Sequence, residues 1–371
     1  MLKQFALLIL MLLCFSMVHA QTEYAPITPE NADTVGAIND LQVAIGFNGQ
    51  DSPATLAFSP TNSNELAVGF QNGEIGIISN VTDEQYQILR WAAHTGATYD
   101  IAYSSDGRYL FSVGPDGRVL QWNAEAGALH QVIEDQDIGA FSVVVHPNQP
   151  IIAVGYNEGI VRMFDYETGE KLLTLRSYEA GVIDVDFHEN GEFFGLAHRN
   201  WAIIVYEYRD LYSEEIYLYE TLYMGELAEF EFQPDVFQEP PLFYIVSLVT
   251  GISNFQSVQS IDIWRRRPID PFYNEYESNS EITYPAAMDY NSGGSLIVAG
   301  GKVSAAGGGC NAVACAVEIM HGVNGKETNL TVINTLELHE VWMTDIVFSE
   351  DDRYIATAAV DGKIIISAAH R

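Results

Sequence analysis

Four acidic residues stand at one position of a repeating pattern and could together bind a cation. Asp100, Asp184, Glu229 and Asp345 each lie three residues before an aromatic residue that ends a short apolar segment. Other copies of the pattern carry Thr55, Ser142 and Ala287 there. Converging carboxylates suit a hard cation such as calcium. We favour the other interpretation, in which these side chains accept hydrogen bonds from neighbouring backbone N–H groups, and we therefore expect no metal and no cofactor.

A second set of polar residues recurs at fixed spacing. His94, Ser112, Asp116 and Trp122 are matched near the C-terminus by His339, Thr357 and Asp361, and the His-to-Asp gap is 22 residues in both copies. No catalytic motif accompanies them. Met343 stands where a zinc-protease helix would have its second histidine, and neither a Gly-x-Ser-x-Gly motif nor a phosphate-binding loop is found. We therefore predict no catalytic residues.

The elements that must position these residues repeat seven times. The copies are anchored at Phe58, Tyr103, Val145, Phe187, Phe232, Tyr290 and Phe348. Apolar residues alternate at period two before the anchors, continuous apolar runs follow them, and Asn-Gly or Asp-Gly turns return the chain in several copies. Repeats of this length cannot bury their own faces alone, so they stack radially. The sequence predicts an all-β fold, a seven-bladed β-propeller of four-stranded blades.

The last repeat has room for only three strands. We predict that residues 38–45 pair with Ile364–Ser367. That pairing would supply the outer strand of blade seven and close the ring, since an open sheet edge invites aggregation. Residues 21–371 would then form one propeller domain.

The arrangement of His94, Ser112, Asp116 and Trp122 resembles the WD-repeat (transducin-beta-type) β-propeller family, and the resemblance extends over residues 27–371. The other copies are degenerate, with Phe164, Tyr206 and Ser367 at the Trp position. We expect a secreted, bacterial-type member. The resemblance implies a hydrogen-bonded network through these four residues that holds the blade rigid, with counterparts at His339, Thr357 and Asp361.

The resemblance also implies a binding face. In the family, partners usually dock on the face whose loops run into the inner strands of the blades. The large residues at the corresponding positions here are Tyr99, Phe141 and Trp342. Each could instead pack between neighbouring loops.

The first 20 residues have the pattern of an export signal. Lys3 precedes an apolar run from Phe5 to Phe15, and Val18-His19-Ala20 is a small-residue cleavage site. We predict cleavage near Ala20, a secreted protein (extracellular or periplasmic) and no membrane insertion after signal removal. Cys310 and Cys315 would then form a structural disulfide, because export favours pairing; free thiols and a redox or metal role are the alternatives.

The net charge of the chain limits the classes of partner that it can bind. The chain has 50 acidic and 17 basic residues and a net charge of -33, which argues against nucleic-acid binding because phosphate contacts need clustered Lys and Arg. The basic run Arg265–Arg267 is either a solvated strand end or a site that binds an anion or an acidic peptide. The tyrosines of an outer hairpin either pack on the sheet or contact carbohydrate; they are Tyr206, Tyr208, Tyr212, Tyr217, Tyr219 and Tyr223.

These observations favour a monomeric, secreted, non-catalytic interaction scaffold that binds a protein or peptide through the loop face. Two alternatives stay open. One is a calcium-dependent propeller hydrolase, similar to lactonases, that uses Asp100, Asp184, Glu229 and Asp345. The other is a carbohydrate-binding surface protein that uses the tyrosines.

Overall fold

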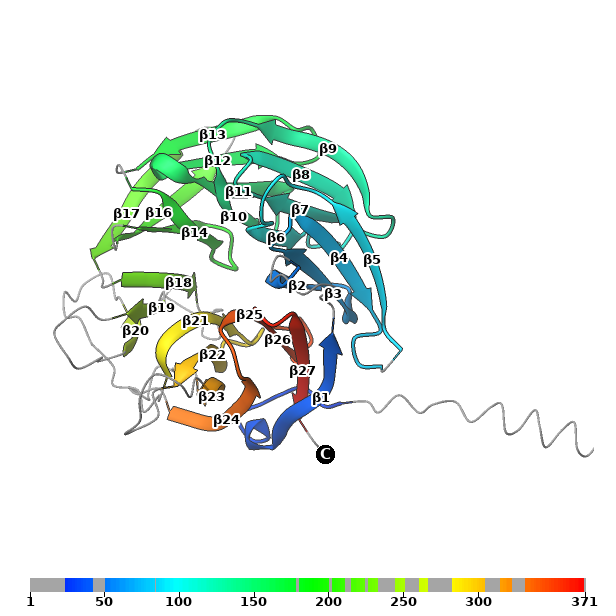
Figure 1. Ribbon diagram of the computed structural model, residues 1–371. Helices are drawn as coiled ribbons and strands as arrows, with labels where there is room; N and C mark the ends of the chain where they lie inside the picture. The colour runs from blue at the N-terminus through cyan, green and yellow to red at the C-terminus, as the bar shows by residue number, and fades with distance from the viewer. Residues whose placement is uncertain are drawn as a thin grey trace, which may run out of the picture.

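The structure, a computed structural model, is all-β in the parts of the chain that it describes (Figure 1). Besides strands, the described residues form two short 3-10 turns, Ala32–Thr34 (η1) and Asn157–Gly159 (η2). Within those ranges no helix has the length and apolar character needed to cross a bilayer. The described ranges are residues 24–42, 51–83, 85–177, 180–199, 202–210, 215–223, 226–232, 244–250, 260–265, 282–303, 314–321 and 331–369.

The strands form antiparallel sheets in which consecutive strands are neighbours. The first three sheets are β2 to β5 (Pro53–Ser59, Asn62–Phe70, Glu74–Ser79, Gln87–Ala92), β6 to β9 (Asp100–Tyr103, Tyr109–Val113, Arg118–Asn123, Ala128–Asp135) and β10 to β13 (Ala140–Val145, Ile151–Tyr156, Ile160–Asp165, Lys171–Arg176). Next come β14 to β17 (Val182–Phe187, Phe193–His198, Ala202–Asp210, Glu215–Tyr223), β18 to β20 (Glu226–Phe232, Tyr244–Thr250, Ser260–Arg265) and β21 to β24 (Ile282–Tyr290, Leu296–Val303, Ala314–His321, Thr331–His339). The remaining sheet has the order β1, β27, β26, β25 (Val35–Gln42, Lys363–Ala369, Ile355–Ala359, Met343–Phe348).

Burial changes from the first strand of a sheet to the last. We call β2, β6, β10, β14, β18, β21 and β25 the inner strands, because they face the centre of the molecule (Figure 1). The second strands β11 and β15 are buried at every residue, as their continuous apolar sequence requires. In the outer strands β5 and β9 all residues but one are exposed or half-buried.

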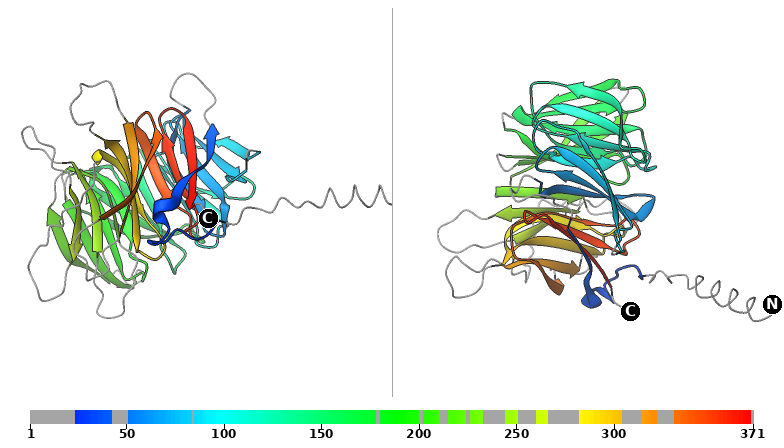
Figure 2. Two further views of the ribbon diagram at one scale, coloured as in Figure 1. Left: turned by 90° about the horizontal axis from the view of Figure 1, so that it is seen from below. Right: turned by 45° about the vertical axis from the view of Figure 1, so that its right-hand side comes forward.

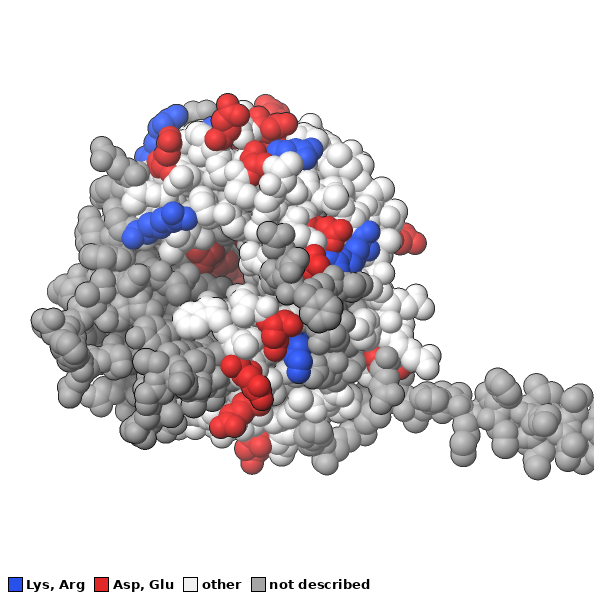
Figure 3. Space-filling view, in the orientation of Figure 1, with Lys and Arg blue, Asp and Glu red and all other residues white. Residues whose placement is uncertain are grey.

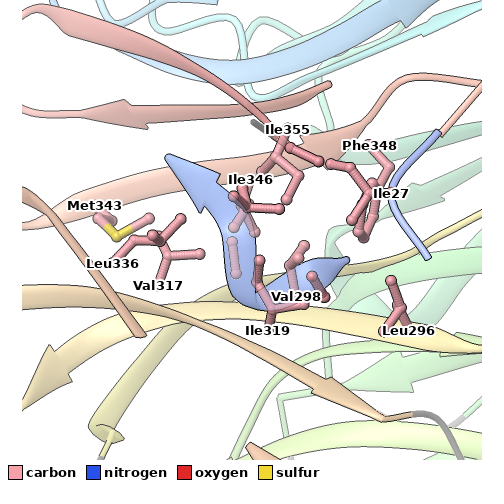
Figure 4. Close-up of a cluster of buried hydrophobic side chains, with 14 residues drawn as sticks. Ile27, Leu296, Val298, Val317, Ile319, Leu336, Met343, Ile346, Phe348 and Ile355 are labelled. Atoms are coloured by element: carbon pink, nitrogen blue, oxygen red, sulfur yellow. The ribbon is translucent and has the colours of Figure 1, made fainter. Parts of the chain in front are cut away.

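The sheets are arranged around a common centre and packed face to face (Figures 1 and 2). Each inner strand contacts the inner strand of the next sheet, and β2 also contacts β25. Apolar clusters fill the spaces between sheets. One cluster joins Leu56 and Val68 of the first sheet to Ile364 and Ile366 of the last. Another joins Leu296 and Val298 to Phe348 and Ile355, with Ile27 of the N-terminal segment among them (Figure 4).

The N-terminal strand β1 completes the last sheet by pairing antiparallel with β27. Ala37 lies opposite Ser367 and Leu41 opposite Ile364. The strand begins at Val35, three residues before the predicted start, and a register irregularity between Ala37 and Asn39 shifts the pairing. Residues 43–45 of the predicted strand lie outside the described residues.

Two of the predicted tight turns depend on glycine. Gly73 and Gly117 have φ of +83° and +72°, a backbone conformation that other residues rarely adopt. A Cβ on Gly117 would lie 1.9 Å from the carbonyl oxygen of Gln136. Glycine at this turn therefore lets the following loop pass close to the backbone.

Candidate functional site

The four residues of the fullest repeat form a hydrogen-bonded chain inside the β6 to β9 sheet. The His94 Nδ1 lies 2.9 Å from Asp116 Oδ1, and the His94 Nε2 lies 2.9 Å from Ser112 Oγ. The Trp122 indole N–H donates to the same Ser112 oxygen at 3.0 Å. Burial lowers the pKa of His94, an effect that the bond to Asp116 opposes. The side chains of His94, Ser112 and Trp122 are buried, so this hydrogen-bonded arrangement suits a structural role.

The C-terminal copy is simpler. His339 Nε2 lies 2.8 Å from Thr357 Oγ1, as the matching pair does in the first copy. Asp361 accepts a hydrogen bond from the Lys363 backbone N–H within its own turn. Ser367 takes the place of the tryptophan and is fully buried.

A further histidine–serine pair was missed by the sequence pattern. His198 Nε2 lies 2.9 Å from Ser177 Oγ, and His198 Nδ1 lies 3.1 Å from the Ala180 carbonyl oxygen. Both side chains are buried. The two residue types have exchanged places relative to His94 and Ser112, and for this reason a search for histidine at a fixed offset does not find them.

Three of the four predicted acidic residues meet in one cavity at the centre of the molecule. Its volume is about 190 Å³, and Figure 3 shows acidic side chains inside the central hollow. Among the described residues, the polar side chains that line it are Thr55, Asp100, Asp184, Asp186, Asp289 and Asp345, and no lysine or arginine lines it. We call this space the central cavity. Glu229 lies on β18, but its side chain is outside the described residues.

Asp186 and Asp289 were not among the predicted residues. Each stands one residue before an anchor, Phe187 or Tyr290. Side chains two residues apart on a strand point to the same side, so this position faces the centre together with the one that the prediction used. The alternation could therefore have identified both.

The aspartates tie neighbouring inner strands together. Asp345 accepts hydrogen bonds from the backbone N–H groups of Ile346, at 2.8 Å, and of Leu56 in the next sheet, at 2.6 Å. Asp100 likewise accepts from Ile101 and from Val143 in the next sheet, both at 2.8 Å. For Asp100 and Asp345, these bonds are of the kind that the structural interpretation expects. Within the described ranges, no group of three or more His, Cys, Asp or Glu side chains could hold a metal ion.

Ionising the aspartates that line the central cavity is unfavourable. Burial, together with the charges of Asp184 and Asp345, raises the pKa of Asp100 to about 7 against the opposing backbone hydrogen bonds. Burial also raises the pKa of Asp345 to about 7, with a contribution from Asp289. Part of this carboxylate set is therefore protonated near neutral pH.

The raised pKa of Asp345 predicts that the stability of the protein depends on pH, and that Asp345→Asn removes this dependence. A carboxyl group whose pKa is raised in the folded state contributes stability that is present below its unfolded pKa and is lost as pH rises through about 7. The unfolding free energy of the wild type relative to Asp345→Asn should fall between pH 5 and pH 8 by on the order of 2 kcal/mol, allowing for partial exposure to the cavity. Urea titrations at four pH values measure it.

Comparing the two proteins cancels the histidine contributions, which run in the opposite direction. Glu167→Gln is the control, because the Glu167 side chain is 60% exposed. The difference in unfolding free energy between Glu167→Gln and the wild type should stay constant between pH 5 and pH 8. An equally flat difference for Asp345→Asn would contradict the assignment.

The predicted aromatic residues lie where chain segments run into the inner strands, an end of the molecule that we call the loop face. Tyr99 and Trp342 directly precede β6 and β25 and are 39% and 46% exposed. Tyr99 stacks on Phe141 of the next sheet, with ring centroids 5.0 Å apart and an interplanar angle of 10°. The Arg199 guanidinium lies 4.6 Å from the Phe141 ring centroid. The sequence pattern did not identify Arg199.

Other predicted residues lie partly outside the described residues. Of the tyrosines, Tyr206 stacks on Phe194 at 5.1 Å and so packs into its sheet. The side chains of Tyr208, Tyr217, Tyr219 and Tyr223 and all of Tyr212 are not described. Cys310, Arg266 and Arg267 also lie outside the described residues, so the disulfide to Cys315 and the role of the basic run stay predictions.

Comparison with known proteins points to WD-repeat proteins. Residues 85–123 and 330–366 match the family model of the WD domain, G-beta repeat. These two segments contain His94 to Trp122 and His339 to Asp361, the two copies of the polar pattern.

Relatives are similar over limited segments. WD repeat-containing protein 55 of Danio rerio is 28% identical over 133 residues, which cover 35% of this chain and 34% of that protein. WD repeat-containing protein 91 of Danio rerio is 28% identical over 171 residues, 43% of this chain and 21% of that protein. Eukaryotic translation initiation factor 3 subunit I of Neurospora crassa is 29% identical over 100 residues, 27% of this chain and 29% of that protein. The matches thus span about a fifth to a third of these relatives.

The prediction of a secreted protein cleaved near Ala20 is wrong. The relatives are two WD repeat-containing proteins of a fish and a eukaryotic translation initiation factor subunit, and translation initiation takes place inside the cell. They also give no support to a bacterial-type member. An apolar run as short as Phe5 to Phe15 is not specific for export, because buried and interfacial segments share its length. What the comparisons support is a chain with WD-repeat segments, similar to proteins of the WD-repeat type.

Proposed function

We propose that this chain is a non-catalytic scaffold, a closed seven-bladed propeller formed by residues 21–371, that binds a protein or peptide on its loop face. WD-repeat relatives suggest a protein-interaction scaffold. The contact of β2 with β25 and the pairing of β1 with β27 support a closed ring. In this proposal the His94, Ser112, Asp116 and Trp122 network keeps the β6 to β9 blade rigid, so that its loops hold their positions.

The stack of Tyr99 on Phe141 is the observation that carries the proposal. Exposed aromatic rings are costly to leave in water and are enriched where proteins bind each other. Tyr99 is held by a ring of the neighbouring sheet and Arg199 covers part of that ring, so the surface is already ordered before a partner arrives. A preordered surface loses little entropy on binding. Trp342, at 46% exposure, adds a second aromatic side chain on the same face.

Selection of displayed peptides against the full chain tests the proposal. Peptides that bind the wild type should lose about tenfold or more in affinity for Tyr99→Ala and for Trp342→Ala, the range expected when an aromatic anchor is removed. Leu129→Ala is the matched control, because Leu129 is 47% exposed but lies on the outer strand β9. Peptides that bind both loop-face variants as tightly as the wild type would refute the loop-face assignment.

A further inference from the structure

We infer that the partner presents a basic side chain, lysine or arginine, that passes the loop-face aromatics and enters the central cavity. The inference rests on the proposed function and adds the chemical class of the partner. It combines the position of the cavity, its charge and size, and the free face of Tyr99.

Three of the five aspartates that line the cavity, Asp100, Asp184 and Asp345, stand in the first half of their inner strands, toward the loop face, whereas Asp186 and Asp289 stand near the ends of theirs. Asp100 is the first residue of β6 and directly follows Tyr99. Asp345 is the third residue of β25 and follows Trp342 by three positions. A ligand that contacts the exposed rings is therefore within reach of these carboxylates.

The charge of the cavity selects a cation. Five aspartates from four inner strands line it, and the groups that face Asp345 are Asp100 from β6, Asp184 and Asp186 from β14, and Asp289 from β21. Thr55 of β2 is the neutral polar neighbour. Mutual repulsion between these groups is relieved by a positive charge, and the surplus of acidic residues over the whole chain attracts basic partners at long range.

The volume of the central cavity indicates whether its ligand is a small molecule or a side chain of a partner. Ligand pockets usually occupy roughly 300–1,000 Å³, whereas this cavity has about 190 Å³. That space fits one long side chain or a few water molecules, at about 30 Å³ each. A peptide that lies across the loop face could insert one residue and leave the rest on the aromatic surface.

The aromatic rings at the loop face suit the same chemistry. Arg199 already lies over Phe141 in the geometry of a cation–π contact. The exposed part of Tyr99 offers a similar ring face that no residue of that stack covers. A guanidinium group could bind there on its way into the cavity.

Calorimetry with the full chain tests the inference, using hexa-arginine as the probe and hexa-citrulline as its neutral control. We expect hexa-arginine alone to bind, and its affinity to fall about ten- to a hundredfold for Asp345→Asn, the range for a lost charge-assisted hydrogen bond. Glu167→Gln removes the same single charge from an exposed position and should leave affinity nearly unchanged. Equal losses in the two variants would mean that only overall charge attracts the peptide and would overturn the inference.

Asp345→Asn could also impair folding, so a second measurement uses the wild type. Because Asp100 and Asp345 have pKa values of about 7, a cation bound beside them displaces protons at pH 7. Titrations in two buffers of different ionisation enthalpy should show proton release, and affinity should rise as pH increases through 7. Binding without proton release would place the peptide elsewhere and overturn the inference.

Failure of this inference differs from failure of the proposed function. If selected peptides depend on Tyr99 and Trp342 but carry no lysine or arginine, the loop face binds and the basic partner is wrong. If binding depends on neither residue, both proposals fail.

Discussion

Deletion of residues 21–46 is expected to produce a protein that aggregates and is cut rapidly by proteases. The deletion removes β1, so the edge of β27 from Lys363 to Ala369 loses its partner strand. It also removes Ile27 and Val35, which are 1% and 5% exposed. Burial of two such side chains stabilises a fold by about 3–6 kcal/mol, which is comparable with the whole stability of many domains. An uncovered edge then pairs with other chains.

Light scattering after gel filtration and limited proteolysis measure this effect. Deletion of residues 21–23 alone is the control, since it stops short of Ile27 and of the strand. A protein that lacks residues 21–46, stays monomeric and melts with the full chain would contradict the closing role of β1.

Replacement of Trp122 by alanine should lower the unfolding free energy by about 3–5 kcal/mol. The indole is 5% exposed and packs 5.6 Å from the Trp91 ring, so its loss leaves a cavity between two sheets. The substitution also removes the indole N–H that donates a hydrogen bond to Ser112 in the buried network. Urea unfolding of the purified variant measures the change.

Two variants show which part of the effect is packing. Trp122→Phe keeps a ring but loses the indole N–H. Its unfolding free energy should fall by about 1 kcal/mol for the lost hydrogen bond, and by a further amount for the smaller cavity. Ser367→Ala alters the equivalent position of the last sheet, where the Ser367 hydroxyl has no hydrogen-bond partner among the described residues. Its unfolding midpoint should hardly move. A Trp122→Ala midpoint shift no larger than that of Ser367→Ala would rule out a packed indole.

Much of the fold could be predicted because strand alternation is a local property. Leu56 with Phe58 and Ile101 with Tyr103 alternate in sequence, and the structure buries all four. The start of β1 could not be predicted as well, because the irregularity at Ala37 depends on pairing with Ser367 at the other end of the chain. A pattern of period two does not reveal an extra residue in a strand.

The candidate site was only partly predictable for a related reason. Asp100, Asp184 and Asp345 stand at a fixed offset and could be found, whereas the contact of Arg199 with Phe141 joins the residue after β15, in the middle of one sheet, to the first strand of the preceding sheet. Such contacts depend on how sheets pack, which the repeat does not encode. The buried pair of Glu134 with Arg162, 2.7 Å apart, was missed for the same reason.

The pairing of Val35 with Ala369 also has a consequence for synthesis of the chain. Val35 is translated before all six sheets that lie between it and Ala369 in the sequence, so β1 has no partner until the ribosome has made those sheets. Contacts so distant in sequence form slowly, because a long loop must close first. During that interval the early sheets can fold in order while the N-terminal strand waits unpaired, exposed to chaperones and to other nascent chains.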